Sequence, residues 1–372
     1  MKIESITLRE IQMPLKEFFE TSFGRTTGRR ILLVTLHCQG NDAWGECVAG
    51  EHPFYSEESV ETAWYAIENY LAPALVGKTF HAGAECVPLF GQVRGHRMAK
   101  AALENALWAA EATEKNVPLF HLLGGTRKQA PCGVSIGIQD SPHKLMEKIS
   151  LELQAGYRRI KVKCKPGWDT EIFAEIRRLW PEIMLSCDAN SAYTLADAGH
   201  LRQFDQFNLL MIEQPLWADD IFFHAALQKQ LRTAICLDES IRNANDAALA
   251  MHLEACKIIN IKVGRVGGFS QAIKVDEVCR EHGVPAWCGG MLESGIGRVH
   301  NLALSSRENF SLPGDVSASS RYWHEDIIEP EVTVSGDGYI AIGDHPGTGY
   351  AVKEKLIETL TTRKVRILPL AN

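Results

Sequence analysis

Five charged residues recur at an even spacing through the middle of the chain. Asp188, Glu213 and Asp238 form the centre of the series, Lys163 precedes them and Lys262 follows, and successive members are 24 or 25 residues apart. Carboxylates that gather in one partly buried site repel one another, and a divalent cation relieves that repulsion. Mg²⁺ prefers such oxygen ligands. The three acids are therefore candidate metal ligands, and the alternative is that each only caps the helix after it.

The lysines are candidates for proton transfer. Lys161 and Lys163 are two residues apart, so in a β-strand both side chains lie on the same face. If that face is enclosed, burial and mutual repulsion lower the pKa of a lysine and make it a usable base. A solvated strand edge is the alternative, because Lys165 continues the alternation. Lys262 supplies a second base on the far side of the three acids.

Two further residues are candidates for tuning these groups. Arg265 follows Lys262 by one helical turn, and its permanent charge would depress the pKa of a nearby lysine; a surface or phosphate-binding role is the alternative. Glu239, next to Asp238, is the second tuning candidate. The sequence has no GxSxG, HExxH or Walker motif, so the usual markers of serine hydrolases, zinc proteases and nucleoside triphosphatases are missing.

Each member of the series ends a short apolar segment, as a strand end would. These segments are residues 159–163, 184–188, 209–213, 234–238 and 258–262. Helix-compatible stretches such as 169–179 lie between them, and alternating strands and helices predict a parallel sheet. The even repeat favours a β/α barrel over an open doubly wound sheet. Active sites of barrels lie at the C-terminal strand ends, so we expect the five residues to converge on one mouth.

The rest of the chain predicts a second domain. Residues 1–125 contain the β-rich run 31–36 and the helix-forming run 98–108, and they predict an N-terminal α+β capping domain. Residues 126–320 are assigned to the barrel. Residues 321–372 break the repeat, and we expect them to return to the capping domain.

Composition excludes several function classes. The chain has 372 residues and a net charge of −7, which gives no general attraction for nucleic acid or anionic lipid. The N-terminus lacks the apolar stretch of a signal peptide, and no apolar run approaches the ~20 residues that span a bilayer. The ten cysteines are scattered, with no zinc-site spacing. We therefore expect a cytoplasmic protein with reduced, buried thiols.

On these residues the sequence resembles the enolase superfamily, in its muconate lactonizing enzyme subgroup, over essentially the whole chain. The subgroup's KxK motif, three acids and later lysine match Lys161, Lys163, Asp188, Glu213, Asp238 and Lys262. Within the subgroup, four segments are similar to o-succinylbenzoate synthases, and most to the branch that also racemises N-succinylamino acids: residues 188–190, 213–215, 289–295 and 312–323. The resemblance implies a modified (β/α)7β barrel of the TIM type with an α+β capping domain.

The resemblance also implies a mechanism. Mg²⁺, or Mn²⁺ or another divalent metal, would be held by Asp188, Glu213 and Asp238. Lys163 would remove the proton next to the substrate carboxylate, and the metal and Lys262 would stabilise the ene-diolate, as enolase-superfamily sites do. The implied activity is dehydration of 2-succinyl-6-hydroxy-2,4-cyclohexadiene-1-carboxylate to o-succinylbenzoate for menaquinone biosynthesis, together with N-succinylamino acid racemisation.

The same resemblance implies which residues contact the substrate, a small carboxylate. Aromatic residues on mobile capping loops are expected to close over its distal part, and the alternative is that each belongs to the core of the capping domain: these are Phe19, Phe23 and Tyr55. Residues near the barrel rim are also expected to contact it: Ser135, Asn190, Gly289, Gly290 and Met291. The paired glycines would allow backbone amides to approach a ligand carboxylate. A homo-oligomer is expected.

Other functions remain open from the sequence. Racemisation of N-acylamino acids is an alternative physiological role, and dipeptide epimerases and cycloisomerases of the subgroup have the same catalytic set. A barrel aldolase that forms a Schiff base on a lysine is a different enzyme class. A binding protein that retains the fold without catalysis is the third class.

Overall fold

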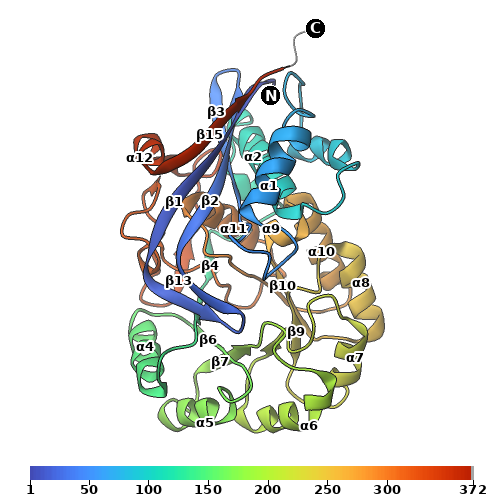
Figure 1. Ribbon diagram of the computed structural model, residues 1–372, viewed down its shortest axis with the longest axis vertical. Coiled ribbons are helices and arrows are strands. Elements are labelled where there is room, and N and C mark those ends of the chain that lie inside the picture. Colours follow the sequence, from blue (N-terminus) through green and yellow to red (C-terminus); the bar gives the residue numbers. More distant parts are fainter. Residues whose placement is uncertain (370–372) are drawn as a thin grey trace.

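The computed structural model describes residues 1–369, which form a sheet-and-helix domain above a β/α barrel (Figure 1). The upper domain is built on an antiparallel sheet with strand order β15-β1-β2-β3. Its strands are β1 (Ile3–Thr21), β2 (Gly24–Cys38), β3 (Asn41–Cys47) and β15 (Thr361–Ile367). Because β15 comes from the end of the described chain, the expected return to the capping domain is confirmed.

One face of this sheet is covered by helices. They are α1 (Val60–Ala66) and α2 (Arg97–Glu114), and the short α3 (Leu119–Leu122) packs against α2. The predicted helix over 98–108 lies within α2, whose alanine-rich face permits close packing on the sheet; Gly45 of β3 lies so close to α2 that a Cβ there would overlap the carbonyl oxygen of Ala102. The long hairpin of β1 and β2 runs from the top of the molecule down towards the barrel (Figure 1).

Seven parallel strands form the barrel sheet in sequential order from β5 to β11. They are β5 (Gly133–Ile136), β6 (Arg159–Lys163), β7 (Met184–Asp188), β8 (Ile212–Glu213), β9 (Ile235–Leu237), β10 (Ile258–Ile261) and β11 (Ala286–Cys288). Nearly every strand residue is buried, as expected where helices cover the outer face and side chains fill the interior.

The helices between these strands surround the barrel. They are α4 (Pro142–Gln154), α5 (Thr170–Leu179), α6 (Ala198–Leu201), α7 (Phe222–Gln228), α8 (Ala244–Leu253), α9 (Val263–Val266), α10 (Phe269–Glu281) and α11 (Gly295–Ser305). The hydrophobic face of α5 shows why: Ile172, Phe173 and Ile176 are spaced at three and four residues and pack into the core.

An extended segment closes the ring between β11 and β5. The amide of Gly133 donates to the carbonyl of Gly314 (2.7 Å), and the amide of Asp315 donates to the carbonyl of Cys288 (2.9 Å). The segment therefore bonds to the first and the last barrel strand at once and fills the eighth position. The predicted barrel with a capping domain is confirmed, whereas the exact domain borders stay predictions.

The C-terminal part links the two domains. β4 (Gln129–Pro131) pairs with β13 (Tyr339–Ala341), β12 (Ile328–Glu329) pairs with β14 (Ala351–Val352), and α12 (Glu354–Leu360) leads into β15. All ten cysteines are free, and nine of them are buried. Within residues 1–369, no helix is long and apolar enough to cross a membrane.

Candidate active site

The five charged residues of the series stand at the C-terminal ends of five successive strands. Lys163, Asp188 and Glu213 are the last residues of β6, β7 and β8, and they are register partners across those strands. Asp238 and Lys262 directly follow β9 and β10. In a ring of eight positions, β6 and β10 are four apart, so the two lysines face each other with three carboxylates between them. The expected convergence on one mouth agrees with the structure.

Lys163 is held entirely by barrel residues. Its Nζ donates to Oδ2 of Asp188 (2.6 Å) and to Oδ1 of Asn190 (2.7 Å). The amide nitrogen of Asn190 donates to Glu239 (2.9 Å). Because this contact with Glu239 holds the amide nitrogen of Asn190, the amide oxygen faces Lys163. The ring of Phe19, from the capping hairpin, lies 6.0 Å from the ammonium group.

Lys262 is held by one barrel residue and one capping residue. Its Nζ donates to Oδ2 of Asp238 (2.8 Å) and to the hydroxyl of Tyr55 (3.1 Å), whose ring centre lies 4.4 Å away. Arg265 pairs with the other oxygen of Asp238 and donates to the carbonyl of Ile241 (2.8 Å). Arg265 and Lys262 therefore share one carboxylate, and a tuning role for Arg265 stays a prediction.

Lys161 lies deeper, among three carboxylates. Its Nζ is 2.6 Å from Glu213, 2.6 Å from Asp315 and 3.3 Å from Asp188. The ring of Trp287 lies 4.7 Å from the same ammonium group. With its donors directed at acids on three sides, Lys161 neutralises the carboxylates and is not placed as a base.

The structure corrects the expectation that burial and repulsion lower the pKa of Lys161. Burial opposes the charged form, but the surrounding acids outweigh it and raise the pKa of Lys161. The pKa of Lys262 is also raised against the effect of burial, with Tyr55 and Glu239 as the largest favourable contributors. Conversely, Lys163 and Lys161 overcome the burial of Asp188 and lower its pKa to about 2. The expectation was wrong because it counted the neighbouring lysines and not the acids at hydrogen-bond distance.

The donor set suits a hard divalent cation. Asp188, Glu213 and Asp238 are all at most 1% exposed, and Lys161 touches two of them at once. Among residues 1–369, no three His, Cys, Asp or Glu side chains are arranged to hold a metal ion. In this arrangement, the ammonium groups of Lys161, Lys163 and Lys262 are bonded to the three acids. Three buried carboxylates from adjacent strand ends nevertheless supply the oxygen donors that Mg²⁺ prefers.

A cavity of about 390 Å³ opens beside the lysines. Most of the predicted substrate contacts line it: Phe19, Phe23, Tyr55, Ser135, Asn190, Gly290 and Met291. In the part of the chain that the structure describes, residues 1–369, the buried hydroxyl of Ser135 has no hydrogen-bond partner. Gly289 does not line this cavity, and its amide donates to the carbonyl of Ile261 (3.1 Å) within the barrel. A Cβ at Gly289 would lie 2.3 Å from Asn260, so packing requires a glycine here, and its substrate contact stays a prediction.

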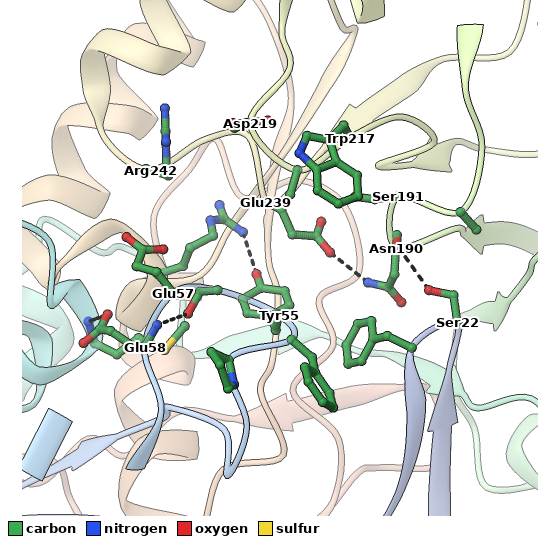
Figure 2. Close-up of a pocket in the computed structure, with 18 of the residues that line it drawn as sticks. Ser22, Tyr55, Glu57, Glu58, Asn190, Ser191, Trp217, Asp219, Glu239 and Arg242 are labelled. Atoms are coloured by element: carbon green, nitrogen blue, oxygen red, sulfur yellow. Dashed lines mark hydrogen bonds between the residues drawn. The ribbon is translucent and has the colours of Figure 1, made fainter. Parts of the chain in front are cut away.

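A second hollow of about 970 Å³ lies outside the first, between the capping loops and the loops of the barrel mouth (Figure 2). The two hollows share Phe23, Phe54, Tyr55 and Asn190. Figure 2 shows Ser22 of the capping hairpin next to Asn190, with Glu239 on the far side of that amide. The outer hollow therefore leads past the capping loops to the lysines.

Sequence reasoning missed two residues of the site. Asp315 binds both Lys161 and Arg159, and it lies on the segment that closes the barrel. Asn260 donates to Glu213 (2.7 Å). The spacing of the charged series does not find Asp315, because steps of 24 or 25 residues from Lys262 lead to residues 286–287 and then 310–312.

Comparison with known proteins agrees with this geometry. Residues 3–124 match the mandelate racemase / muconate lactonizing enzyme N-terminal domain, and residues 144–356 match the enolase C-terminal domain-like family. The chain is 51% identical to an o-succinylbenzoate synthase of Geobacillus kaustophilus (97% of this chain, 96% of the other) and 45% identical to an N-succinylamino acid racemase of Amycolatopsis (99% and 100%).

A crystal structure of an enolase-superfamily member from Listeria innocua superposes with a TM-score of 0.95 at 37% identity, covering 99% of both chains. Family matches over both domains, full-length relatives and a shared fold agree with the arrangement of lysines and acids at the barrel mouth. This chain belongs to the mandelate racemase / muconate lactonizing enzyme family of the enolase superfamily.

Proposed function

We propose that this protein is an o-succinylbenzoate synthase that also racemises N-succinylamino acids, with Mg²⁺ as its metal. The proposal rests on the positions of Lys163 and Lys262, which lie on opposite sides of the barrel mouth with three carboxylates between them. Both activities are named among relatives that match nearly the full length of the chain. The two reactions start with the same step, removal of the proton next to a carboxylate.

In dehydration, Lys163 removes the α-proton of the cyclohexadiene acid. The ene-diolate then expels its hydroxyl group, and Lys163 returns the same proton to that group, so that water leaves. The Lys262 cation balances the negative charge of the intermediate. When bound, the metal at Asp188, Glu213 and Asp238 would withdraw electron density from the substrate carboxylate.

In racemisation, the two lysines have complementary tasks. The lysine facing the α-proton acts as base, and the opposite lysine, in its ammonium form, delivers a proton to the other face. One lysine alone can exchange a proton but cannot invert the centre. The opposed positions of Lys163 and Lys262 support this assignment.

Steady-state rates of the purified protein test the proposal. We expect turnover of the cyclohexadiene acid and of N-succinylamino acids, loss of both with EDTA, and recovery with Mg²⁺; Mn²⁺ or another divalent metal is the comparison. If racemisation has a higher kcat/KM than dehydration, racemisation becomes the favoured physiological role. Epimerisation rates on dipeptides test the epimerase alternative. No turnover of any of these acids would refute the proposal.

The other two classes have distinct signatures. A Schiff-base aldolase would be trapped on a lysine by borohydride and would survive EDTA. A protein that only binds would leave the α-proton of carboxylic acids unexchanged in D2O.

We also propose a homo-oligomer, which light scattering tests.

A further inference from the structure

Each of the two capping loops reaches one catalytic lysine, but by different routes. Ser22, in the turn between β1 and β2, donates to the backbone carbonyl of Asn190 (3.1 Å), and the side chain of Asn190 contacts Lys163. Tyr55, in the loop between β3 and α1, contacts Lys262 directly through its hydroxyl (3.1 Å). Figure 2 shows Ser22 and Tyr55 on the capping side of the outer hollow.

The surroundings of the two lysines are therefore unequal. Both hydrogen-bond acceptors of Lys163, Asp188 and Asn190, belong to the rigid barrel. Lys262 has one barrel acceptor, Asp238, and one capping acceptor, Tyr55. Barrel residues alone can aim Lys163, whereas the direction of the Lys262 ammonium group depends on a loop of the other domain.

The hydroxyl of Tyr55 both accepts and donates a hydrogen bond. It accepts from Lys262 and donates to Oδ1 of Asp238 (3.0 Å). The phenol ring also packs against the ammonium group, with 4.4 Å between Nζ and the ring centre. If a metal occupied Asp238, the Tyr55 hydroxyl would remain as an acceptor for Nζ.

We propose that Tyr55 is a positioning residue for Lys262, which it aims at the α-carbon from the capping domain. Proton transfer at the face of the substrate next to Lys262 therefore requires the loop between β3 and α1 to be closed. This inference rests on the proposed racemase reaction. Dehydration, which asks of Lys262 only a positive charge, depends far less on its exact direction.

Tyr55→Phe tests the proposal because it keeps the ring and removes only the hydroxyl. The assay follows loss of the α-proton by NMR in D2O, separately for each enantiomer of N-succinylphenylalanine, at saturating Mg²⁺. A hydrogen bond to a charged group is worth roughly tenfold or more in rate. We expect exchange from the Lys262 face to fall at least about tenfold, while exchange from the Lys163 face changes by less than about threefold.

Tyr65→Phe is the matched control. Tyr65 is an exposed tyrosine on α1 of the same domain, and its hydroxyl approaches only that of Tyr70 (3.4 Å). We expect this variant to exchange both enantiomers at the wild-type rates. The dehydration rate of Tyr55→Phe, measured in parallel, should fall less than its exchange from the Lys262 face.

The outcomes separate this inference from the proposed function. Equal losses for both enantiomers would mean that Tyr55 acts on substrate or metal binding, and would overturn the positioning role. Unchanged exchange on both faces would overturn it as well. If the wild-type protein exchanges neither enantiomer, the racemase proposal itself fails, and the inference falls with it.

Discussion

Replacing Lys262 with arginine separates the two reactions most sharply. The residue is 7% exposed, and its side chain lies against Asp238 and Tyr55, so Lys262→Arg keeps a buried cation next to the same acid. A guanidinium group does not lose its proton near neutral pH and cannot serve as a base. The substitution therefore preserves the charge that stabilises the ene-diolate and removes proton transfer from one face.

The size of the effect follows from that division. A well-placed acid or base contributes about 10²–10⁴-fold to a rate, or roughly 3–5 kcal/mol of barrier. We expect racemisation by Lys262→Arg to fall by about this factor. Dehydration needs proton transfer from Lys163 alone, and we expect it to fall by only about tenfold, from the changed position of the cation.

Two measurements check this prediction on one protein preparation. Polarimetry gives the racemisation rate of an N-succinylamino acid, and ultraviolet absorbance gives the dehydration rate of the cyclohexadiene acid. In D2O, the enantiomer whose proton faces Lys163 should still exchange, and its mirror image should not. Racemisation at a near wild-type rate would refute the assignment of one lysine to each face, and the role of Lys262 would be withdrawn.

Three further predictions address the base, the metal and the fold. Lys163→Ala should lower both activities by at least about 10²-fold, because the α-proton on that face has no other acceptor; a loss below about tenfold, by steady-state kinetics, would place the base elsewhere. Glu213→Gln should weaken Mg²⁺ binding, read by titration, and abolish turnover with the circular dichroism spectrum kept; unchanged activity at limiting Mg²⁺ would remove Glu213 from the ligand set. Burial lowers the pKa of His300 from 6.5 to about 4, so the unfolded chain binds its proton more readily and the folded state loses up to roughly 3 kcal/mol as pH falls from 6.5 to 4. In urea unfolding at pH 7 and pH 4.5, His300→Leu should lack this loss, and an equal pH dependence in both proteins would contradict it.

The sequence predicted the fold and the convergence of the five charged residues where a regular repeat carried the information. Parallel strands end on one side of a barrel, so residues 24 or 25 apart that end successive strands meet at one mouth. The repeat is readable because each of these strands lies within a compact βα unit. It stops being readable at β11, after which an irregular segment carries Asp315 to the site.

Other features depend on atomic distances that a sequence does not contain. The pKa of Lys161 is raised and not lowered because three acids lie within 3.3 Å of its ammonium group. Gly289 and Gly290 look equivalent in sequence, yet only Gly290 lines the cavity, because the barrel already uses the amide of Gly289. The contact of Tyr55 with Lys262 joins residues 207 positions apart in different domains, and no local pattern predicts it.

The pairing of β15 with β1 has a consequence for biosynthesis. Arg366 of β15 donates to Ser5 of β1, 361 positions earlier in the chain. During translation, β1 therefore waits for this partner until the whole barrel has been made, and the fourth strand joins the capping sheet last. Contacts of such long sequence separation form slowly. The hairpin of β1 and β2, which carries Phe19 and Ser22 to the active site, therefore gains its last sheet partner only after the barrel segments have been synthesised.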